Sequence, residues 1–175
     1  MEKRLIIFTD SGDTIIDETT QVYDERGIVL RADGIPGAYE TLRKLHDDGY
    51  RICMVADGEV ESFDNVYREN GMGDCFDTRT ISEAVGLQKP NREMFDDAMA
   101  KNGLTEEDKK RIVMIGNNCP KDIAGANRYG LTSILIDWSK RYRVTPANED
   151  EVPDHIIHEP KELIPIIEAL EANLN

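Results

Sequence analysis

The chain has 175 residues, with 21 lysines and arginines against 35 aspartates and glutamates, so its formal net charge is −14. This acidic balance argues against sequence-independent binding to nucleic acid, where basic side chains displace the counterions of the phosphate backbone. No run approaches the roughly 20 apolar residues of a membrane span, so we expect neither a nucleic acid nor a membrane as a partner.

Short apolar runs rich in isoleucine and valine recur along the chain. Their length and β-branching favour buried strands over helix fragments. The predicted strands are residues 5–8, 51–55, 111–115, 132–136 and 155–157.

Amphipathic stretches lie between these runs, and several end at a glycine that can stop a helix. These glycines are Gly49, Gly71, Gly103 and Gly130, and a last helix is predicted over 162–172. Strands that alternate with helices pair in parallel through right-handed crossovers. We therefore predict an α/β fold of three layers with a Rossmann-like parallel sheet, built as one domain over residues 1–175.

One stretch breaks the alternation just after the first predicted strand. Residues 20–23 and 28–31 flank the turn sequence DERG, which predicts a small β-hairpin. We expect this hairpin to project as a flap within an insertion over residues 18–33.

The N-terminal sequence and the cysteines indicate the compartment. The apolar stretch in MEKRLIIFTD is too short for a secretory signal. Cys53, Cys75 and Cys119 are odd in number and widely spaced, which is typical of reduced thiols rather than of a disulfide frame or a zinc site. We therefore expect a cytoplasmic protein.

Residues capable of chemistry follow the predicted strands. Ligands of such folds bind beyond the carboxyl ends of the strands. There the chain places TDSGDT at 9–14, ADG at 56–58, QKP at 88–90 and GNN at 116–118, with Asp122 close behind. One aspartate after a strand is commonly a turn or cap residue. Two aspartates, a lysine and two asparagines that converge from separate strands favour a catalytic or metal site.

These segments resemble the motifs of a known family. FTDSGDTIID is similar to the first motif of the haloacid dehalogenase-like (HAD) hydrolases, an apolar strand followed by Asp-x-Asp-x-Thr. GLQKPNREMFDDAM resembles the Lys-Pro motif of that family, and IVMIGNNCPKDIAGANRYG resembles its Gly-Asp…Asp motif. PDHIIHEPKELIPII resembles the closing strand and helix of that family. Each motif alone is weak, but the ordered set covers nearly the whole chain.

The resemblance implies phosphoryl transfer through an aspartyl intermediate. Asp10 would be the nucleophile, and Lys89 would neutralise charge on Asp10 and on the phosphoryl oxygens. A magnesium ion would bridge Asp10, the backbone carbonyl of Gly12 and the motif that holds Asn117 and Asp122.

The resemblance also implies which residues bind the phosphate of the substrate. Backbone amides around Ser11 and Gly12 would cradle its oxygens, and Thr14 would hold the loop by hydrogen bonds. The remaining phosphate-binding positions implied by the motifs are Ala56, Asp57 and Asn118.

Three positions depart from the family pattern. Gly12 replaces the second aspartate, which protonates the leaving group and then activates water, and Asp13 beside it is a poor substitute. Loss of a positioned general acid costs about 10²–10⁴ in rate, so we expect a preference for substrates with good leaving groups. Ala56 replaces a serine or threonine that donates to phosphate. Asn117 replaces the first aspartate of the metal motif, which lowers the expected affinity for magnesium.

These departures leave two alternatives to a phosphatase. One is a catalytically weak or inactive HAD-fold protein that binds a phosphorylated ligand or a protein partner. The other is a dehalogenase, because halide leaves without protonation. Only about 45 residues separate Asp10 from the second motif. We therefore expect no separate cap domain, and a site that is open or covered by a second copy of the chain.

Four further side chains have weaker functional interpretations. His155 and His158 are spaced to form a metal pair, but they flank a predicted strand. Trp138 is placed to stack on a substrate or to pack at a strand end. Arg141 and Arg143 are candidates for a second phosphate contact or for a solvated loop.

Overall fold

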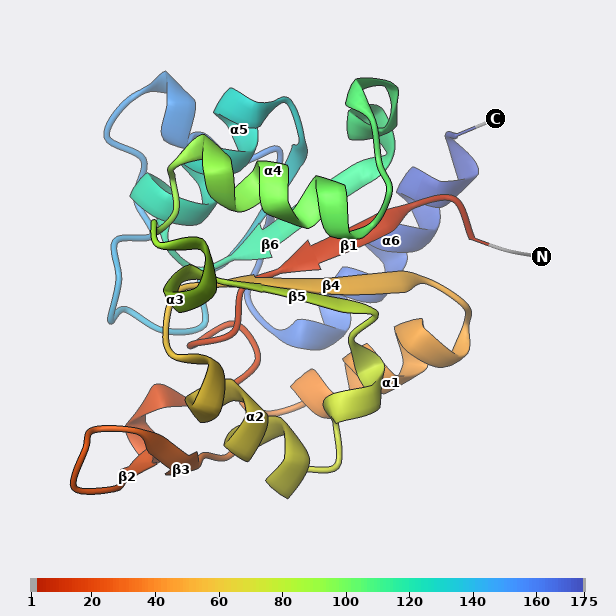
Figure 1. Ribbon diagram of the computed structural model, residues 1–175. Coiled ribbons are helices and arrows are strands. Elements are labelled where there is room, and N and C mark those ends of the chain that lie inside the picture. The colour runs from red at the N-terminus through yellow and green to blue at the C-terminus, as the bar shows by residue number, and fades with distance from the viewer. Residues whose placement is uncertain (1–2, 175) are drawn as a thin grey trace.

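A central sheet of six parallel strands organises the computed structural model, which describes residues 3–174 (Figure 1). The strand order is β5-β4-β1-β6-β7-β8. The strands are β1 (Ile6–Thr9), β4 (Arg51–Ala56), β5 (Thr78–Ile81), β6 (Ile112–Gly116), β7 (Thr132–Ile136) and β8 (His155–Ile157). The predicted α/β fold with a parallel sheet is confirmed, and β5 is an edge strand that the sequence analysis did not predict.

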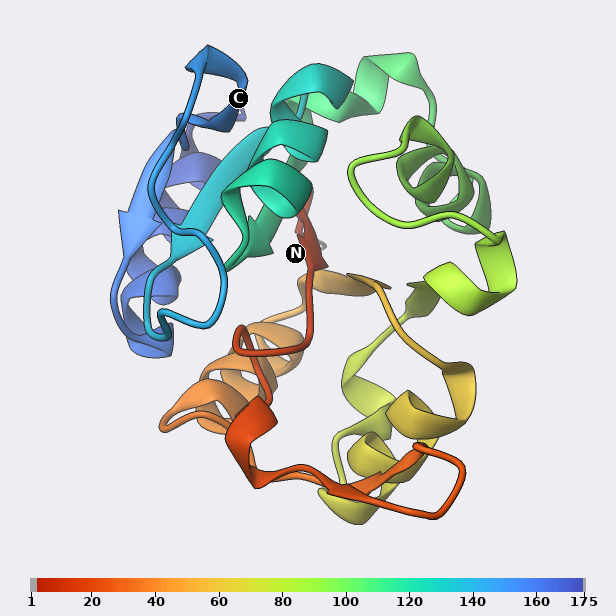
Figure 2. The ribbon, with the colours of Figure 1, turned by 90° about the vertical axis from the view of Figure 1, so that its left-hand side faces the viewer.

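Six α-helices within residues 3–174 complete the architecture. They are α1 (Ala38–Asp47), α2 (Val60–Glu69), α3 (Ser82–Val85), α4 (Arg92–Lys101), α5 (Ala124–Tyr129) and α6 (Leu163–Ala172). Figures 1 and 2 show α4 and α5 on one side of the sheet, and α1 and α6 on the other. The helices predicted to end near glycines are present, whereas α3, only four residues long, was not predicted.

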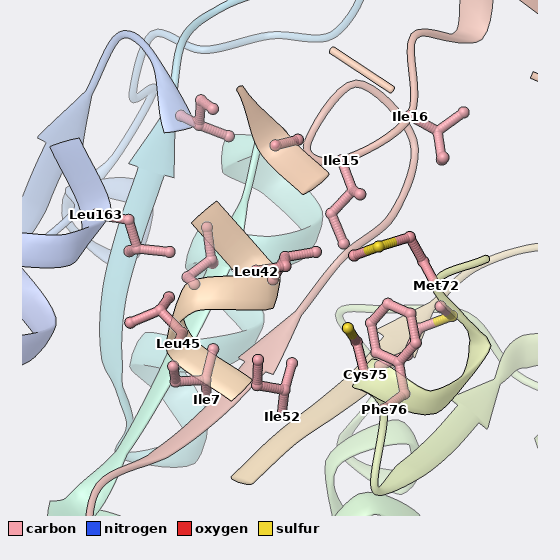
Figure 3. Packing of buried hydrophobic residues seen from close by; sticks show 14 of the residues in the cluster. Ile7, Ile15, Ile16, Leu42, Leu45, Ile52, Met72, Cys75, Phe76 and Leu163 are labelled. Carbon is pink, nitrogen blue, oxygen red and sulfur yellow. The ribbon is translucent and has the colours of Figure 1, made fainter. Parts of the chain in front are cut away.

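Alternate residues of β1 explain why helices cover both faces. Ile7 joins a large apolar cluster that includes Leu42 and Leu45 of α1 and Leu163 of α6 (Figure 3). Ile6 and Phe8 point to the opposite face and join a second cluster with α4 and α5. Successive side chains of a strand point to opposite faces, so a strand covered on both sides reads as a continuous apolar run.

The predicted hairpin is present but shorter, and it lies against α2. Its strands are β2 (Val22–Tyr23) and β3 (Val29–Arg31), and residues Glu18–Thr20 form a 3-10 turn before them. Val29 donates its N–H to Ser62 Oγ at 3.0 Å, and its carbonyl accepts from Asn65 Nδ2 at 3.1 Å. The hairpin is therefore fixed along α2 (Figure 2).

Two general expectations can be compared with the described residues. Cys53, Cys75 and Cys119 are free thiols and all are buried. Within residues 3–174, no helix has the length and apolar character needed to cross a membrane.

Candidate active site

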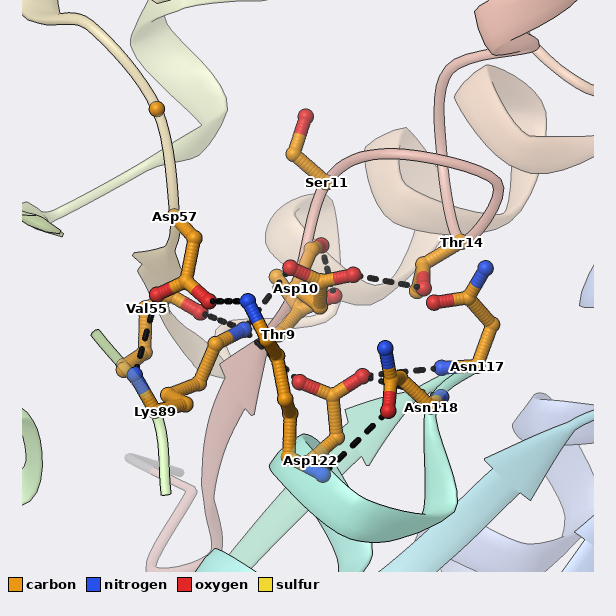
Figure 4. Close-up of polar contacts among 12 residues, drawn as sticks. Thr9, Asp10, Ser11, Thr14, Val55, Asp57, Lys89, Asn117, Asn118 and Asp122 are labelled. Atoms are coloured by element: carbon orange, nitrogen blue, oxygen red, sulfur yellow. Dashed lines mark hydrogen bonds and ion pairs between the residues drawn. The ribbon is translucent and has the colours of Figure 1, made fainter. Parts of the chain in front are cut away.

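The first element of the site is the loop that follows β1. Asp10 donates its backbone N–H to the carbonyl of Ile115 in β6 at 2.9 Å, which fixes it at the carboxyl edge of the sheet. Thr14, Ile15 and Ile16 all donate backbone N–H groups to the carbonyl of Ser11, so the loop turns tightly. Thr14 Oγ1 donates to Asp10 Oδ2 at 3.3 Å (Figure 4). Thr14 therefore contacts the Ser11 carbonyl through its backbone N–H and the Asp10 carboxylate through its hydroxyl.

The Lys89 ammonium lies at the centre of the site, with only 1% of its side chain exposed. Its Nζ is 2.8 Å from Asp10 Oδ1, 2.7 Å from Asp122 Oδ1 and 2.7 Å from the carbonyl of Val55 (Figure 4). These three acceptors use the three protons of an ammonium group. Burial acts to lower the pKa of Lys89, but the carboxylates of Asp10 and Asp122 outweigh it and raise that pKa. Lys89 is therefore a fixed positive charge.

Asp122 is buried beneath Lys89 and is fully hydrogen-bonded. Its Oδ1 faces Lys89, and its Oδ2 accepts the backbone N–H groups of Asn117 and Asn118, each at 3.1 Å. Burial raises the pKa of the Asp122 carboxyl, Asp10 adds to this effect, and Lys89 opposes it. Both oxygens of Asp122 are thus engaged by this chain.

Asp57, at the carboxyl end of β4, links the Lys89 segment to the rim of the site. Its Oδ1 accepts the backbone N–H of Lys89 at 3.0 Å, and its Oδ2 lies 2.9 Å from Lys121 Nζ. Lys121 Nζ also donates to Gln88 Oε1 at 3.0 Å. Asn118 Oδ1 accepts the backbone N–H of Lys121 at 3.2 Å. Lys121 is therefore a second cation of the site, and the sequence analysis did not single it out.

A pocket at this edge of the sheet brings most of the predicted residues together. Those that line it are Asp10, Gly12, Asp57, Lys89, Asn117, Asn118 and Asp122. Ser11, Thr14 and Ala56 do not line it. Ser11 Oγ instead pairs with Tyr67 Oη at 2.7 Å, and Ala56 is completely buried.

Glu18 and Tyr142 also line the pocket, and the sequence analysis missed both. Tyr142 Oη donates to Glu18 Oε2 at 2.8 Å, although 124 residues separate the two. Arg141 Nε lies 3.1 Å from the same Oε2 and 2.9 Å from Asp13 Oδ2. Burial is the largest influence on Glu18 and raises its pKa, while the Tyr142 hydrogen bond acts in the opposite direction. No motif spacing marks Glu18 among the 35 acidic residues.

The weaker interpretations have different outcomes. Arg141 binds Asp13 and Glu18, and Arg143 pairs with Glu151. His158 pairs with Asp137. Trp138 packs against the large apolar cluster. Among residues 3–174, no three histidine, cysteine, aspartate or glutamate side chains group as a metal site would require.

Comparison with known proteins identifies the family. Residues 2–130 match the family model of the haloacid dehalogenase-like hydrolases. The chain belongs to this family. It is 33% identical over 136 residues to the glyceraldehyde 3-phosphate phosphatase of Methanopyrus kandleri, a match that covers 77% of this chain and 57% of that protein. It is also 31% identical over 107 residues to the pyrimidine 5'-nucleotidase YjjG of Escherichia coli, which covers 61% of this chain and 46% of that protein. The chain spans about half the length of the curated relatives it matches.

Solved structures of HAD proteins share the fold. A HAD phosphatase from Thermococcus onnurineus superposes with a TM-score of 0.74 at 20% identity, covering 93% of this chain and 97% of that one. The L-2-haloacid dehalogenase RSc1362 gives a TM-score of 0.76 at 15% identity, covering 96% and 100%. At these identities the likeness concerns the fold, which both kinds of HAD hydrolase share.

Proposed function

We propose that this HAD-like hydrolase is a phosphatase that works through a covalent intermediate on Asp10. The observation that carries the proposal is the pairing of Asp10 with the buried Lys89 ammonium at 2.8 Å, in a pocket at the carboxyl edge of the sheet. The relatives named as phosphatases and as a nucleotidase support a phosphorylated substrate.

The charges of the pocket match the demands of phosphoryl transfer. Lys89 places a positive charge 2.8 Å from the Asp10 carboxylate, and a carboxylate is the nucleophilic form of this side chain. Lys121 at the rim places a second positive charge where the oxygens of a phosphoryl group would enter. Positive groups fixed before the reaction stabilise developing charge without reorganising. Asp57 contacts both lysines, because it accepts from the backbone N–H of Lys89 and from the ammonium of Lys121.

Magnesium is the cofactor that the family implies, and the pocket offers hard oxygen donors for it. The side chain of Asn117 lines the pocket, and its buried Nδ2 has no hydrogen-bond partner among the described residues. The oxygen and nitrogen of an asparagine amide exchange places by a flip, so this side chain is free to turn an oxygen toward a cation.

We propose that Asp10, the carbonyl of Gly12 and the side chain of Asn117 would hold the ion, because all three offer oxygen donors. Asp122, which the resemblance places in this set, has both oxygens engaged. We therefore assign Asp122 to holding Lys89 and the 117–118 backbone. When bound, magnesium would offset the negative charge of the phosphoryl group.

The test is hydrolysis of p-nitrophenyl phosphate and acetyl phosphate, with and without magnesium, by the wild type and by Asp10→Asn. Both compounds have good leaving groups and make a small demand on proton donation. We expect magnesium-dependent turnover that Asp10→Asn abolishes. If the wild type hydrolyses neither compound faster than Asp10→Asn, the phosphatase proposal is wrong.

A further inference from the structure

The carboxylate of Glu18 occupies the space beside Gly12 where a side chain would otherwise project. A Cβ atom added to Gly12 would lie 1.9 Å from Glu18 Oε1 and 2.8 Å from its Cδ. Side chains cannot approach so closely, so a side chain at position 12 and Glu18 in its present position exclude each other. The absence of a side chain at position 12 is therefore matched by a carboxylate supplied from six residues further along the chain.

Contacts from two loops fix Glu18 in this position. Asp13 Oδ1 accepts the backbone N–H of Glu18 at 2.9 Å. Asp13 is fully buried and has a φ of 48°, an uncommon conformation for a residue other than glycine. Arg141 bridges Asp13 Oδ2 and Glu18 Oε2, and Tyr142 Oη also donates to Oε2. Arg141 and Tyr142 therefore hold Oε2, whereas Oε1 lies on the Gly12 side, 3.2 Å from the same Tyr142 hydroxyl.

The other carboxylates of the pocket have different partners. Asp10 and Asp122 share the Lys89 ammonium, and Asp57 is paired with Lys121. Glu18 lines the same pocket, and no lysine ammonium is among its ion-pair partners in residues 3–174. It is thus the carboxyl group of this pocket that is placed to exchange a proton with a bound molecule.

We propose that Glu18 is the general acid and base of the reaction, a role that rests on the proposed phosphatase function. In the first step Asp10 attacks phosphorus, the bond from phosphorus to the alkoxide oxygen breaks, and the Glu18 carboxyl gives its proton to that oxygen. In the second step the Glu18 carboxylate takes a proton from water. The water oxygen attacks phosphorus, and the bond to Asp10 breaks. The products are an alcohol and inorganic phosphate, and both carboxyl groups return to their starting states.

The first experiment compares Glu18→Gln with Glu25→Gln in the hydrolysis of p-nitrophenyl phosphate. Steady-state turnover is measured, and the first turnover is measured separately by rapid quench. Glu25 lies exposed in the turn of the hairpin, so it provides the same chemical change outside the pocket. We expect Glu18→Gln to reduce steady-state turnover by about 10²–10⁴-fold. It should retain a burst of close to one equivalent of p-nitrophenol, because p-nitrophenol leaves without a proton donor and the water step is blocked. Glu25→Gln should match the wild type.

The second experiment moves the carboxylate. Glu18→Ala empties the space beside Gly12, and the double variant Gly12→Asp/Glu18→Ala puts a carboxylate there on a shorter side chain. We expect the double variant to be at least tenfold faster than Glu18→Ala, which a merely structural role of Glu18 would not produce. Circular dichroism and urea unfolding of each variant confirm that the comparison is between folded proteins.

The outcomes distinguish failure of the phosphatase function from failure of the role given to Glu18. A wild type no faster than Asp10→Asn overturns the phosphatase function and the role of Glu18 together. An active wild type matched by Glu18→Gln overturns only the role of Glu18. A Glu18→Gln variant that needs more magnesium but reaches wild-type turnover at saturation also overturns it, because Glu18 would then be a metal ligand.

Discussion

The Lys89 ammonium lies 2.7 Å from Oδ1 of Asp122, and the two side chains are only 1% and 2% exposed. Both charges are buried away from water, and the attraction between them offsets the free energy lost by desolvating each one. Asp122 in turn orders the backbone of Asn117 and Asn118. The pair is thus a structural support for the pocket as well as a source of positive charge beside Asp10.

Replacing Lys89 by methionine should therefore destabilise the fold. The variant keeps most of the side-chain volume but leaves Asp122 buried without its cation, a change that typically costs roughly 3–5 kcal/mol. Urea unfolding at neutral pH measures the loss. Lys121→Met is the matched control, because the Lys121 side chain is 37% exposed and exposed pairs contribute less than about 1 kcal/mol. Equal losses for the two variants would contradict the role given to the Lys89–Asp122 pair.

Most of the sheet could be predicted from the sequence, because strands covered on both faces are continuous apolar runs. Ile52, Met54 and Ile134, for example, are completely buried. The β5 strand has the sequence TRTI and lies at the edge of the sheet, where only Thr80 and Ile81 are buried. The β5 strand is held in the sheet by its pairing with β4 and by a hydrogen bond from Thr80 Oγ1 to Asp97. Such contacts leave no local pattern.

At the candidate site, too, some residues could be predicted from the sequence pattern, and others are placed only by tertiary contacts. Asp10, Asp57 and Asn117 each follow a parallel strand, so topology alone brings them to one edge of the sheet. Glu18 lies between β1 and β2, and Tyr142 lies in the loop after β7. Only tertiary contacts place them together in the pocket. The prediction of one domain over 1–175 without a separate cap stays a prediction.

Gly116, the last residue of β6, packs directly against Asp122. An added Cβ would lie 2.2 Å from Asp122 Oδ2 and 2.4 Å from its Cβ. Because Asp122 is fixed by Lys89 and two backbone amides, it cannot move aside without losing hydrogen bonds. Gly116→Ala should lower the free energy of unfolding by roughly 1–3 kcal/mol, the usual cost of overpacking a core.

Gly73→Ala is the control for this substitution. The nearest atom to an added Cβ at Gly73 is Arg79 Nη2 at 3.6 Å, an ordinary contact distance. This variant should stay within about 0.5 kcal/mol of the wild type. Denaturant unfolding of the two variants side by side measures the difference, and a Gly116→Ala protein as stable as Gly73→Ala would show that Asp122 is not held rigidly.

Ser11 and Tyr67 form a buried hydroxyl pair behind the Asp10 loop, with 2.7 Å between the two oxygens. Either single variant, Ser11→Ala or Tyr67→Phe, leaves the other hydroxyl buried without this partner, which costs about 1–3 kcal/mol. The double variant removes both groups together and should be less destabilised than the sum of the singles. A double-mutant cycle by urea unfolding should give a coupling of about 1 kcal/mol. Additive losses would show that the pair does not interact in solution.

His158 forms an exposed pair with Asp137 beyond the end of β8. The hydrogen bond and the negative charge of Asp137 raise the pKa of His158 above its ordinary value of 6.5. The folded state therefore holds this proton more tightly than the unfolded chain. The resulting stabilisation is fully present below pH 6.5 and is lost as the pH rises through the higher pKa of the folded state.

An NMR titration of the His158 ring should show the raised pKa, and Asp137→Asn should bring it back toward 6.5. Asp74→Asn, which breaks a surface pair with Arg43 instead, should leave the titration unchanged. A His158 pKa that is the same in the wild type and in Asp137→Asn would show that the ion pair does not persist in solution.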